Sequence, residues 1–281
     1  MPRPPIDYQA KIEDMLGHVG PMPAEATTPL AHYTLAANAA MNMRKYLVRP
    51  LEKVAHYPAV RERHLHVLNN MLLVNLVQSM ERFFKDIASV CVDHLCDRVV
   101  DNRFDELSVK GSFLAAHFED SSAGTALCES DTWLSCRQIN DRFKKFLKHP
   151  TGVGDPFHIF PPNGDEFRTM NVVWQLRHSL VHNVGVLTRS DAAKLKVLAR
   201  RHVDSPRMLM PEISDLRYLR SYLDQRAQAV NQRVADRLGL VLSAIHRQNS
   251  MLFAPQEEAD NLTSKFGVVV TVAGAAGVLP P

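Results

Sequence analysis

The sequence predicts an all-α protein, and three observations support this prediction. Apolar residues recur at steps of three and four along several long segments, which is the spacing of one helix face. Aromatic residues make up only 7% of the chain and glycines number 12, which argues against a β-sandwich or a glycine-rich nucleotide fold. Strand patterns are weak outside the C-terminal tail. We therefore expect a helical bundle with a helical extension before it and a short apolar tail after it.

The chain divides into three parts where prolines cluster and the apolar pattern changes. Residues 1–58 should form an N-terminal extension of two helices, broken at a pair of prolines that would end the first one. Residues 59–252 should form the main helical domain. Residues 253–281 form an apolar tail, which could be a small hairpin, a strand that pairs elsewhere, or disorder.

The main domain should begin with one long helix over 59–100. Apolar residues follow one face of this helix and then a second edge: Leu65, Leu68, Leu72, Leu76, Met80, Phe83, Ile87 and Val90, and then Leu73, Val77, Phe84 and Cys91. A helix that is apolar around so much of its circumference is expected to be buried against several partners. Its polar residues Gln78, Glu81 and Lys85 lie along another side.

Helix signals alternate with breakers through the middle of the chain. We expect helices over 112–118 and 132–148, and a loop over 149–164, where prolines and glycines are dense. The next helix should begin at Asp165, which could cap it, and end near Gly185, where a left-handed residue is needed.

Two further helices are expected after Gly185. Thr188 and Asp191 stand three apart in the pattern of a capping box, which predicts a helix that runs to about Val203. Pro211 then opens a last long helix that continues to about His246 with apolar residues at helical spacing.

Charge, cysteine content and terminal sequence favour a cytoplasmic protein without membrane contact. Lys and Arg outnumber Asp and Glu by 33 to 30, a mild basic bias that is compatible with nucleic acid. Four cysteines in a chain of 281 residues do not indicate a disulfide framework. The N-terminus lacks the apolar run of a signal peptide, and the longest uncharged apolar run, Phe266 to Leu279, is too short to cross a membrane.

The densest group of chemically active side chains lies near the end of the helix that starts at about residue 165. Arg177, His178, His182 and Asn183 fall within seven residues. A permanent cation and groups that titrate near neutral pH are what cleavage of a phosphodiester needs. Two alternatives stay open: an ordinary polar helix face, or a zinc site that uses the two histidines. Ser179 weakens the zinc interpretation, because it stands where zinc proteases carry a glutamate.

Residues 174–186, Trp-Gln-Leu-Arg-His-Ser-Leu-Val-His-Asn-Val-Gly-Val, resemble the signature of HEPN-domain proteins. These are helical domains, and many are ribonucleases of toxin, abortive-infection and antiphage systems. Arg177, the polar residue after it and His182 fit the four-residue form of the family motif. The long upstream helix with an internal glutamate, here Glu81, adds to a resemblance that covers roughly residues 60–250. Val184 departs from the tyrosine of the HEPN toxins that pair with nucleotidyltransferase antitoxins, which argues against silencing by nucleotide addition there.

The resemblance implies a metal-independent endoribonuclease, a toxin or an antiviral defence effector, that uses no cofactor and leaves a 2′,3′-cyclic phosphate and a 5′-hydroxyl. His182 would act as general acid or base, and Arg177 would clamp the phosphate. His178 and Asn183 would orient the substrate or the catalytic ring. Glu81 could reach the site from the long helix, although a surface pair with the lysine four residues later explains it as well.

The expected partners are RNA and a second copy of the chain. Arg177 and His182 are separated by roughly 140° around a helix, so one helix makes an incomplete site. The resemblance implies a composite site in a homodimer. An antitoxin or a sensor protein could be a further partner. Basic residues that could follow an RNA backbone are Arg137, Arg142, Lys144, Lys145, Arg189, Lys194, Arg200 and Arg201. The alternative function is a non-catalytic HEPN-like module that binds RNA or a partner protein.

Overall fold

The computed structural model describes residues 23–52, 58–99, 102–104, 122–129, 132–152, 156–199 and 206–274. This part of the chain is mostly helical, which confirms the prediction of an all-α protein, and its one sheet has two residues in each strand. In chain order its elements are α2 (Pro29–Glu52), α3 (Pro58–Leu95), the 3-10 helix η2 (Asn102–Phe104), α5 (Ala123–Glu129), α6 (Cys136–Phe146), α7 (Asp165–His182), β1 (Val186–Leu187), α8 (Arg189–Ala199), β2 (Arg207–Met208), α9 (Ile213–Gln248) and α10 (Pro255–Phe266).

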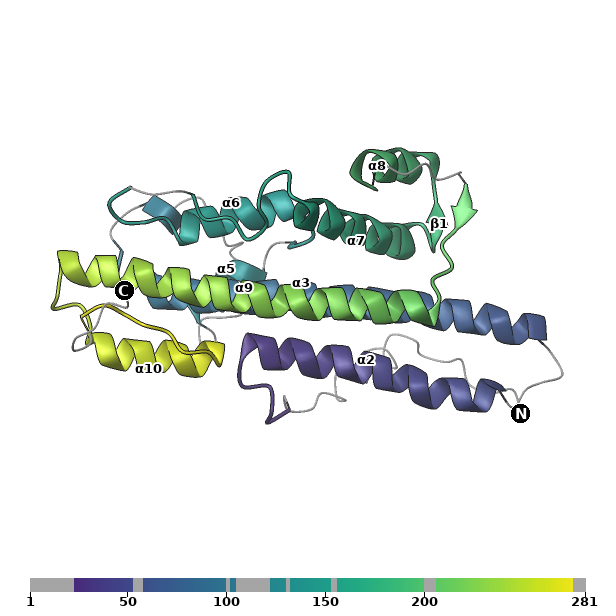
Figure 1. Cartoon of the computed structure of the whole chain (residues 1–281), viewed down its shortest axis with the longest axis horizontal. Helices are drawn as coiled ribbons and strands as arrows, with labels where there is room; N and C mark the ends of the chain where they lie inside the picture. Colours follow the sequence, from purple (N-terminus) through teal and green to yellow (C-terminus); the bar gives the residue numbers. More distant parts are fainter. Residues whose placement is uncertain are drawn as a thin grey trace, which may run out of the picture.

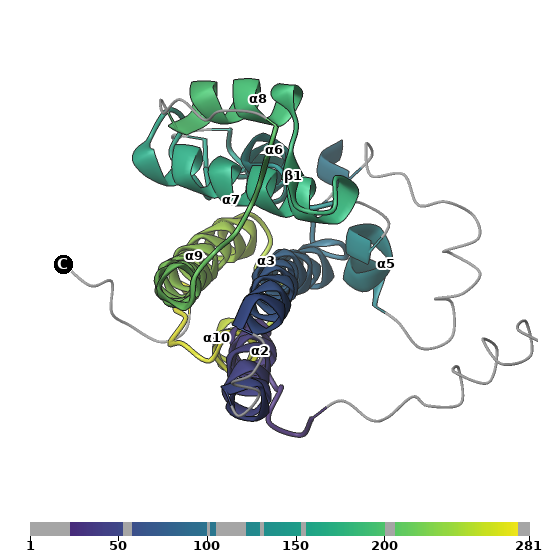
Figure 2. The same ribbon diagram turned by 90° about the vertical axis from the view of Figure 1, so that its right-hand side faces the viewer.

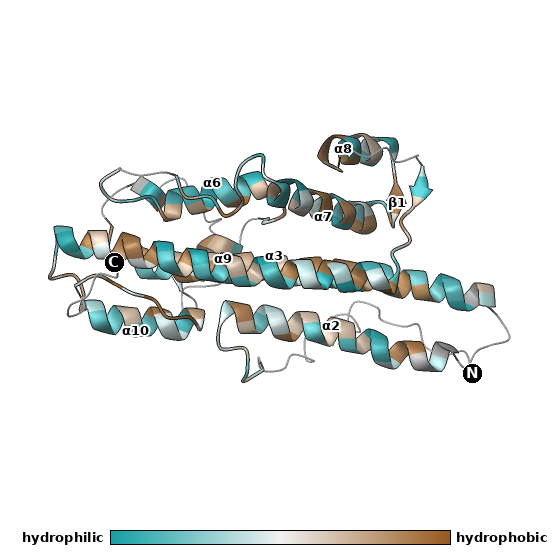
Figure 3. Cartoon of the chain, viewed as in Figure 1, coloured by the Kyte–Doolittle hydropathy of each residue, from teal (hydrophilic) through white to brown (hydrophobic). Residues whose placement is uncertain are grey.

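The helices lie in three layers (Figure 1). The two longest helices, α3 and α9, form the middle layer. On one side of them lie α2 and α10, and on the other side lie α6, α7 and α8, as the end-on view also shows (Figure 2). Hydrophobic and hydrophilic residues are interleaved along each long helix (Figure 3), as one buried and one exposed face require.

The core follows the apolar stripe that the sequence shows along α3. Phe83 and Phe84 are fully buried, together with most of the predicted stripe, and only Leu65 and Val90 of it are half-buried. The ring of Phe84 meets those of Phe160 and Trp174 at centroid distances of 5.8 and 6.4 Å. Trp174 belongs to α7, so this aromatic contact fixes the motif helix against the middle layer.

The buried side chains of the outer helices α2 and α10 join the same core. Tyr33 of α2 is 2% exposed, and Leu262 and Phe266 of α10 are essentially inaccessible. All three belong to one hydrophobic cluster with α3 and α9. No helix of the described residues is long and apolar enough to span a bilayer.

The tail differs from the small hairpin or disorder expected for 253–281. Residues Pro255–Phe266 form α10, which opens with a proline and two acidic residues in its first turn. It ends at Gly267, which adopts a left-handed φ of 67°. These are ordinary helix signals. The prediction of a hairpin, strand or disorder was based on the uncharged run that follows them. Residues 275–281 of the expected tail lie outside the described residues.

After α10 the chain returns along α9 at a point of close approach. Val270 and Val272 are buried there, and a Cβ on Gly239 would lie 2.6 Å from the Thr271 carbonyl oxygen. The Ala273 amide donates to the Ser243 hydroxyl at 2.7 Å. The expected helix over 112–118 and the first expected helix of the N-terminal extension lie outside the described residues.

Candidate functional site

The motif helix α7 ends close to where the sequence predicts. Its start is shifted by one residue, because Gly164 takes the cap position and Asp165 is the first helical residue. At its other end the amides of Asn183 and Gly185 both donate to the Ser179 carbonyl oxygen at 3.1 Å. Gly185 has a φ of 80°, in the left-handed region where a side chain is disfavoured. The chain therefore turns sharply away just beyond His182.

A buried carboxylate, Asp191, holds this helix end. The amides of Gln175 and Asn183 donate to its two oxygens at 2.8 Å each. Thr188 completes the predicted capping box: its backbone amide donates to Asp191 at 3.1 Å, and its hydroxyl accepts from the Asp191 amide at 3.2 Å. Burial by itself would raise the pKa of Asp191, but the hydrogen bonds from Thr188, Asn183 and Ser179 lower it below the ordinary value.

Three of the predicted site residues, Arg177, His178 and His182, line one pocket of about 300 Å³. The wall opposite α7 comes from the residues just before α6 and from α8. The other lining residues are Leu134, Ser135, Asn171, Trp174, Gln175 and Leu198. The pocket is thus half apolar and half polar, and it carries a cation and two imidazoles at one end.

The two histidines lie against each other on the surface of α7. The rings of His178 and His182 have centroids 4.6 Å apart and are inclined by 41°. Both residues are exposed, so their ring nitrogens are accessible to a ligand in the pocket. This juxtaposition follows from their spacing of one helical turn.

Arg177 is half-buried beside the histidines and is not neutralised by an acid. Its Nε is buried without a hydrogen-bond partner. In the part of the chain that the structure describes, no carboxylate forms an ion pair with Arg177. The planar guanidinium of such an arginine is available to donate paired hydrogen bonds to two oxygens of a phosphate.

The structure does not bring Asn183 and Glu81 into the pocket. Asn183 is taken by Asp191, so it supports the helix end from behind. Glu81 of α3 accepts from the backbone amide of Trp133 at 3.2 Å, and among the described contacts none joins it to Arg177 or His182. The alternative of a surface pair with Lys85 is not found either, since that lysine lies 3.9 Å from Glu129.

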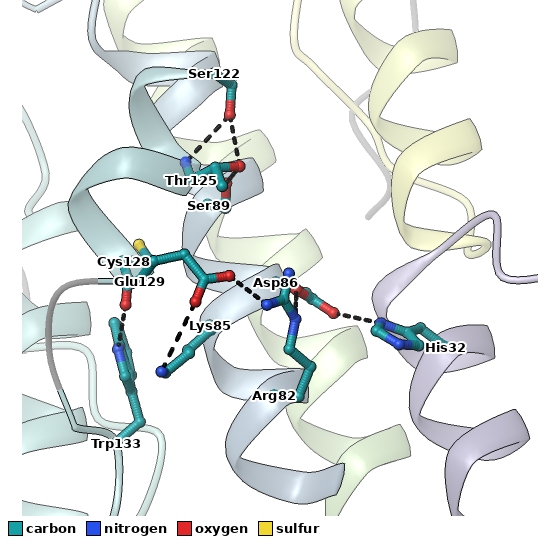
Figure 4. A network of polar contacts seen from close by, with 10 residues as sticks. All are labelled: His32, Arg82, Lys85, Asp86, Ser89, Ser122, Thr125, Cys128, Glu129 and Trp133. Carbon is teal, nitrogen blue, oxygen red and sulfur yellow. Dashed lines mark hydrogen bonds and ion pairs between the residues drawn. The ribbon is translucent and has the colours of Figure 1, made fainter. Parts of the chain in front are cut away.

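A separate polar network on α3 connects this helix to α2 and α5 (Figure 4). Arg82 bonds to Asp86 at 2.6 Å and to Glu129 of α5, and Asp86 also lies 2.8 Å from the His32 ring of α2. The indole of Trp133 donates to the Cys128 carbonyl oxygen at 3.0 Å. Helix α5 is thereby joined to α2 and α3.

The basic residues expected to follow RNA differ in their surroundings. Arg137, Lys144 and Lys145 are exposed on α6, and Arg189 and Lys194 are exposed on α8. Arg142 instead lies over the Trp133 ring, 4.5 Å from its centroid, and donates to the Thr132 carbonyl oxygen. Arg200 and Arg201 lie outside the described residues.

Sequence reasoning missed Asp191 as a residue of the site and also missed the apolar half of the pocket. The capping-box pattern contained the signal for Asp191 as a helix start, but its bonds to α7 depend on how the two helices meet. Trp174 belongs to the signature 174–186, but nothing in that pattern indicates that it lines the pocket. Within the described residues no three His, Cys, Asp or Glu side chains gather as metal ligands would.

Fold and site together define a helical protein with an arginine and two histidines in one pocket near the C-terminal end of a helix, α7, that packs one face against the core. Comparisons of the chain with protein-family models, with curated proteins and with solved structures found no match.

Proposed function

We propose that the protein is a metal-independent endoribonuclease with an HEPN-like fold. The observation that carries this proposal is that Arg177, His178 and His182 line one pocket, with both imidazoles exposed and the guanidinium unpaired by any acid of the described chain. Cleavage of a phosphodiester needs a fixed cation to stabilise the phosphate charge and a side chain that can transfer protons near neutral pH. Among the described residues, no carboxylate forms an ion pair with Arg177 that a phosphate would have to displace.

In this proposal RNA supplies its own nucleophile, the ribose 2′-hydroxyl. His182 accepts the proton of that hydroxyl or returns a proton to the leaving 5′-oxygen. Arg177 donates to the phosphate oxygens and stabilises the charge that develops on them. His178, whose ring lies against that of His182, orients the ring or the substrate. The products are a 2′,3′-cyclic phosphate and a 5′-hydroxyl.

One chain supplies only one Arg177 and one His182, whereas the reaction uses a base and an acid. We therefore propose that two copies of the chain meet at the exposed end of α7, so that the site is shared across a homodimer. A toxin or antiviral defence effector fits this activity. Because Val184 replaces a modifiable tyrosine, control would come from another partner, such as an antitoxin or a sensor protein.

The cleavage assay uses purified protein, a mixture of RNAs and EDTA. We expect the wild type to cleave, and Arg177→Ala and His182→Ala to be slower by about 100-fold or more, because each removes one element of proton transfer or charge stabilisation. Arg63→Ala and His64→Ala, which change the same residue types on the exposed face of α3, serve as matched controls and should retain activity. Cleavage that survives both motif substitutions contradicts the proposal.

Two further readouts separate the proposal from its alternative. The cleaved ends should carry the cyclic phosphate, and Arg177→Lys should recover only part of the activity because a lysine lacks the paired donors of arginine. A wild type that binds RNA or a protein partner tightly but leaves RNA intact in every condition supports the non-catalytic module instead.

A further inference from the structure

A second group of cations lies on α9, away from the pocket. Arg226, Arg233 and Arg237 occur at intervals of seven and four residues, so they share one face of the helix, and together they form what we call the arginine stripe. In Figure 1 this helix runs beneath α6 and α7. The stripe faces the beginning of α7 and the segment that precedes it, as its hydrogen bonds show.

Among the residues that the structure describes, a single carboxylate contacts the stripe. Glu166, in the first turn of α7, forms an ion pair with Arg226, and its second oxygen lies 3.9 Å from Arg233. Arg233 is otherwise bound by a backbone group, since its Nη2 donates to the Ile159 carbonyl oxygen at 2.7 Å. Arg237 likewise donates from Nε to the Leu147 carbonyl oxygen at 3.2 Å.

The stripe therefore carries more positive charge than the described residues around it neutralise. Three guanidiniums face one carboxylate among the described residues, and the Nε atoms of Arg226 and Arg233 are buried without a partner. Burial lowers the pKa of all three arginines, and the nearby Arg233 adds to the lowering at Arg226. Gathering partly desolvated cations is unfavourable unless an anion compensates them.

Further cations stand at the end of the stripe. Burial and the charges of Arg237 and Arg247 lower the pKa of His149. Lys148, beside His149, is exposed. The nearest acid on this part of α9, Asp236, accepts from Gln232 at 2.9 Å and forms no ion pair with the stripe in the described structure.

We propose that the arginine stripe is a binding site for phosphate groups, supplied by an RNA strand or by a free nucleotide. The side chains of Arg226 and Arg233 are 19% and 37% exposed, so each is held by the protein and still open to solvent. At 1.5 Å per residue, the Cα atoms of Arg226 and Arg233 lie about 10 Å apart along the helix, and those of Arg233 and Arg237 about 6 Å apart. This spacing suits several phosphates in a row. The guanidinium fork matches the phosphate oxygens. The stripe shares no residue with the pocket, and its binding requires no cleavage.

The test measures binding of three probes to the whole protein: inorganic phosphate, ATP and a short oligodeoxynucleotide. The oligodeoxynucleotide has no 2′-hydroxyl, so the proposed nuclease cannot cut it. We expect Arg233→Gln and Arg237→Gln to weaken binding of at least one probe about tenfold. For the oligodeoxynucleotide, each substitution should also reduce the steepness of the fall of log affinity with log salt concentration by about one. Lys265→Gln, which removes an exposed charge from α10 in the opposite layer, is the matched control.

The probes also distinguish the source of the phosphate. Stripe-dependent binding of the oligodeoxynucleotide alone indicates a nucleic-acid backbone, and stripe-dependent binding of ATP indicates a nucleotide. Arg237→Lys keeps the positive charge but lacks the paired donors of the guanidinium. If a glutamine variant fails to fold, this lysine variant takes its place and must weaken binding. The proposal is overturned if the wild type binds none of the probes, or if the folded stripe variants bind like Lys265→Gln. Both results are independent of the cleavage assay.

Discussion

The side-chain amide of Asn183 donates to the carboxylate of Asp191 at 2.8 Å, which ties the end of α7 to the beginning of α8. Asp191 is only 2% exposed and also accepts from Gln175, one turn before Ser179. The residues that line the pocket therefore stand on a helix whose last turn is fixed by one buried acid. This arrangement is the reason that a small change at Asp191 should affect both stability and the site.

Asp191→Asn should lower the free energy of unfolding by about 2–3 kcal/mol at neutral pH, because charge-assisted bonds are lost and amide donors lose their acceptor. The folded-state pKa of Asp191 is depressed, so its contribution is present above the ordinary carboxyl pKa and is lost as the pH falls through the lowered value. Urea denaturation at neutral and acidic pH measures this, and the difference between variant and wild type should shrink on the acid side. The exposed Asp260→Asn on α10 should show neither effect. Equal stability of Asp191→Asn and wild type at neutral pH would contradict the assignment.

Val184→Gly should stabilise the protein by about 1 kcal/mol. Val184 has a φ of 50°, a left-handed conformation that is strained for a β-branched side chain, and at 81% exposure it contributes little packing. The melting temperature should rise. Val197→Gly, at a position 77% exposed within α8, should lower it, because glycine is a poorer helix residue than valine. A fall in both variants would show that Val184 is not strained.

Glu258→Gln should cost about 3 kcal/mol or more, because it leaves the half-buried guanidinium of Arg98 and the buried His94 ring without their charged partner. Glu258 lies 2.6 Å from the His94 ring and is gripped by both terminal nitrogens of Arg98, which joins α10 to the end of α3. Burial alone would raise the pKa of Glu258, but His94 and Arg98 lower it, so this stability is also lost as the pH falls through the lowered value. Thermal unfolding checks the cost. The neighbouring exposed Glu257→Gln should be close to neutral, and an equal loss in the two variants would refute the argument.

Glu81→Gln should keep nearly all stability and cleavage, whereas Glu81→Ala should lose about 1 kcal/mol of stability and part of the activity. The physical reason is that Glu81 acts as an acceptor for the Trp133 amide, and a glutamine oxygen accepts equally well. The measurements are urea denaturation and the RNA cleavage rate. A glutamine variant that folds normally but is as slow as His182→Ala would instead place the Glu81 charge in the reaction.

The local sequence pattern was sufficient to predict features that depend only on residues within one helix or at its ends. The apolar stripe of α3, the capping box at Thr188 and the stop at Gly185 all follow from spacing and backbone preference, and all are found in the structure. The grouping of Arg177, His178 and His182 was predictable in part for the same reason, since residues one turn apart share a helix face.

Partners that come from distant segments were not predictable in this way. Asn183 and Glu81 were expected at the site, yet each is bound by a group that only the packing of helices brings near: Asp191 in one case and the Trp133 amide in the other. The pairing of the arginine stripe could not be predicted from the sequence either. Its spacing along α9 is visible in the sequence, but its shortage of acids depends on which segment lies opposite.

By itself, the sequence determined which segments are helical, where the motif helix stops and which of its side chains share a face, because these depend on interactions within a few residues. Only the tertiary structure decided which polar groups are paired and which stay free. Most buried donors and acceptors are paired, and which partner is nearest depends on how the helices pack, as α8 packs against α7 to bring Asp191 to Asn183. For this reason Asn183 is held behind the pocket while Arg177 is left open to it.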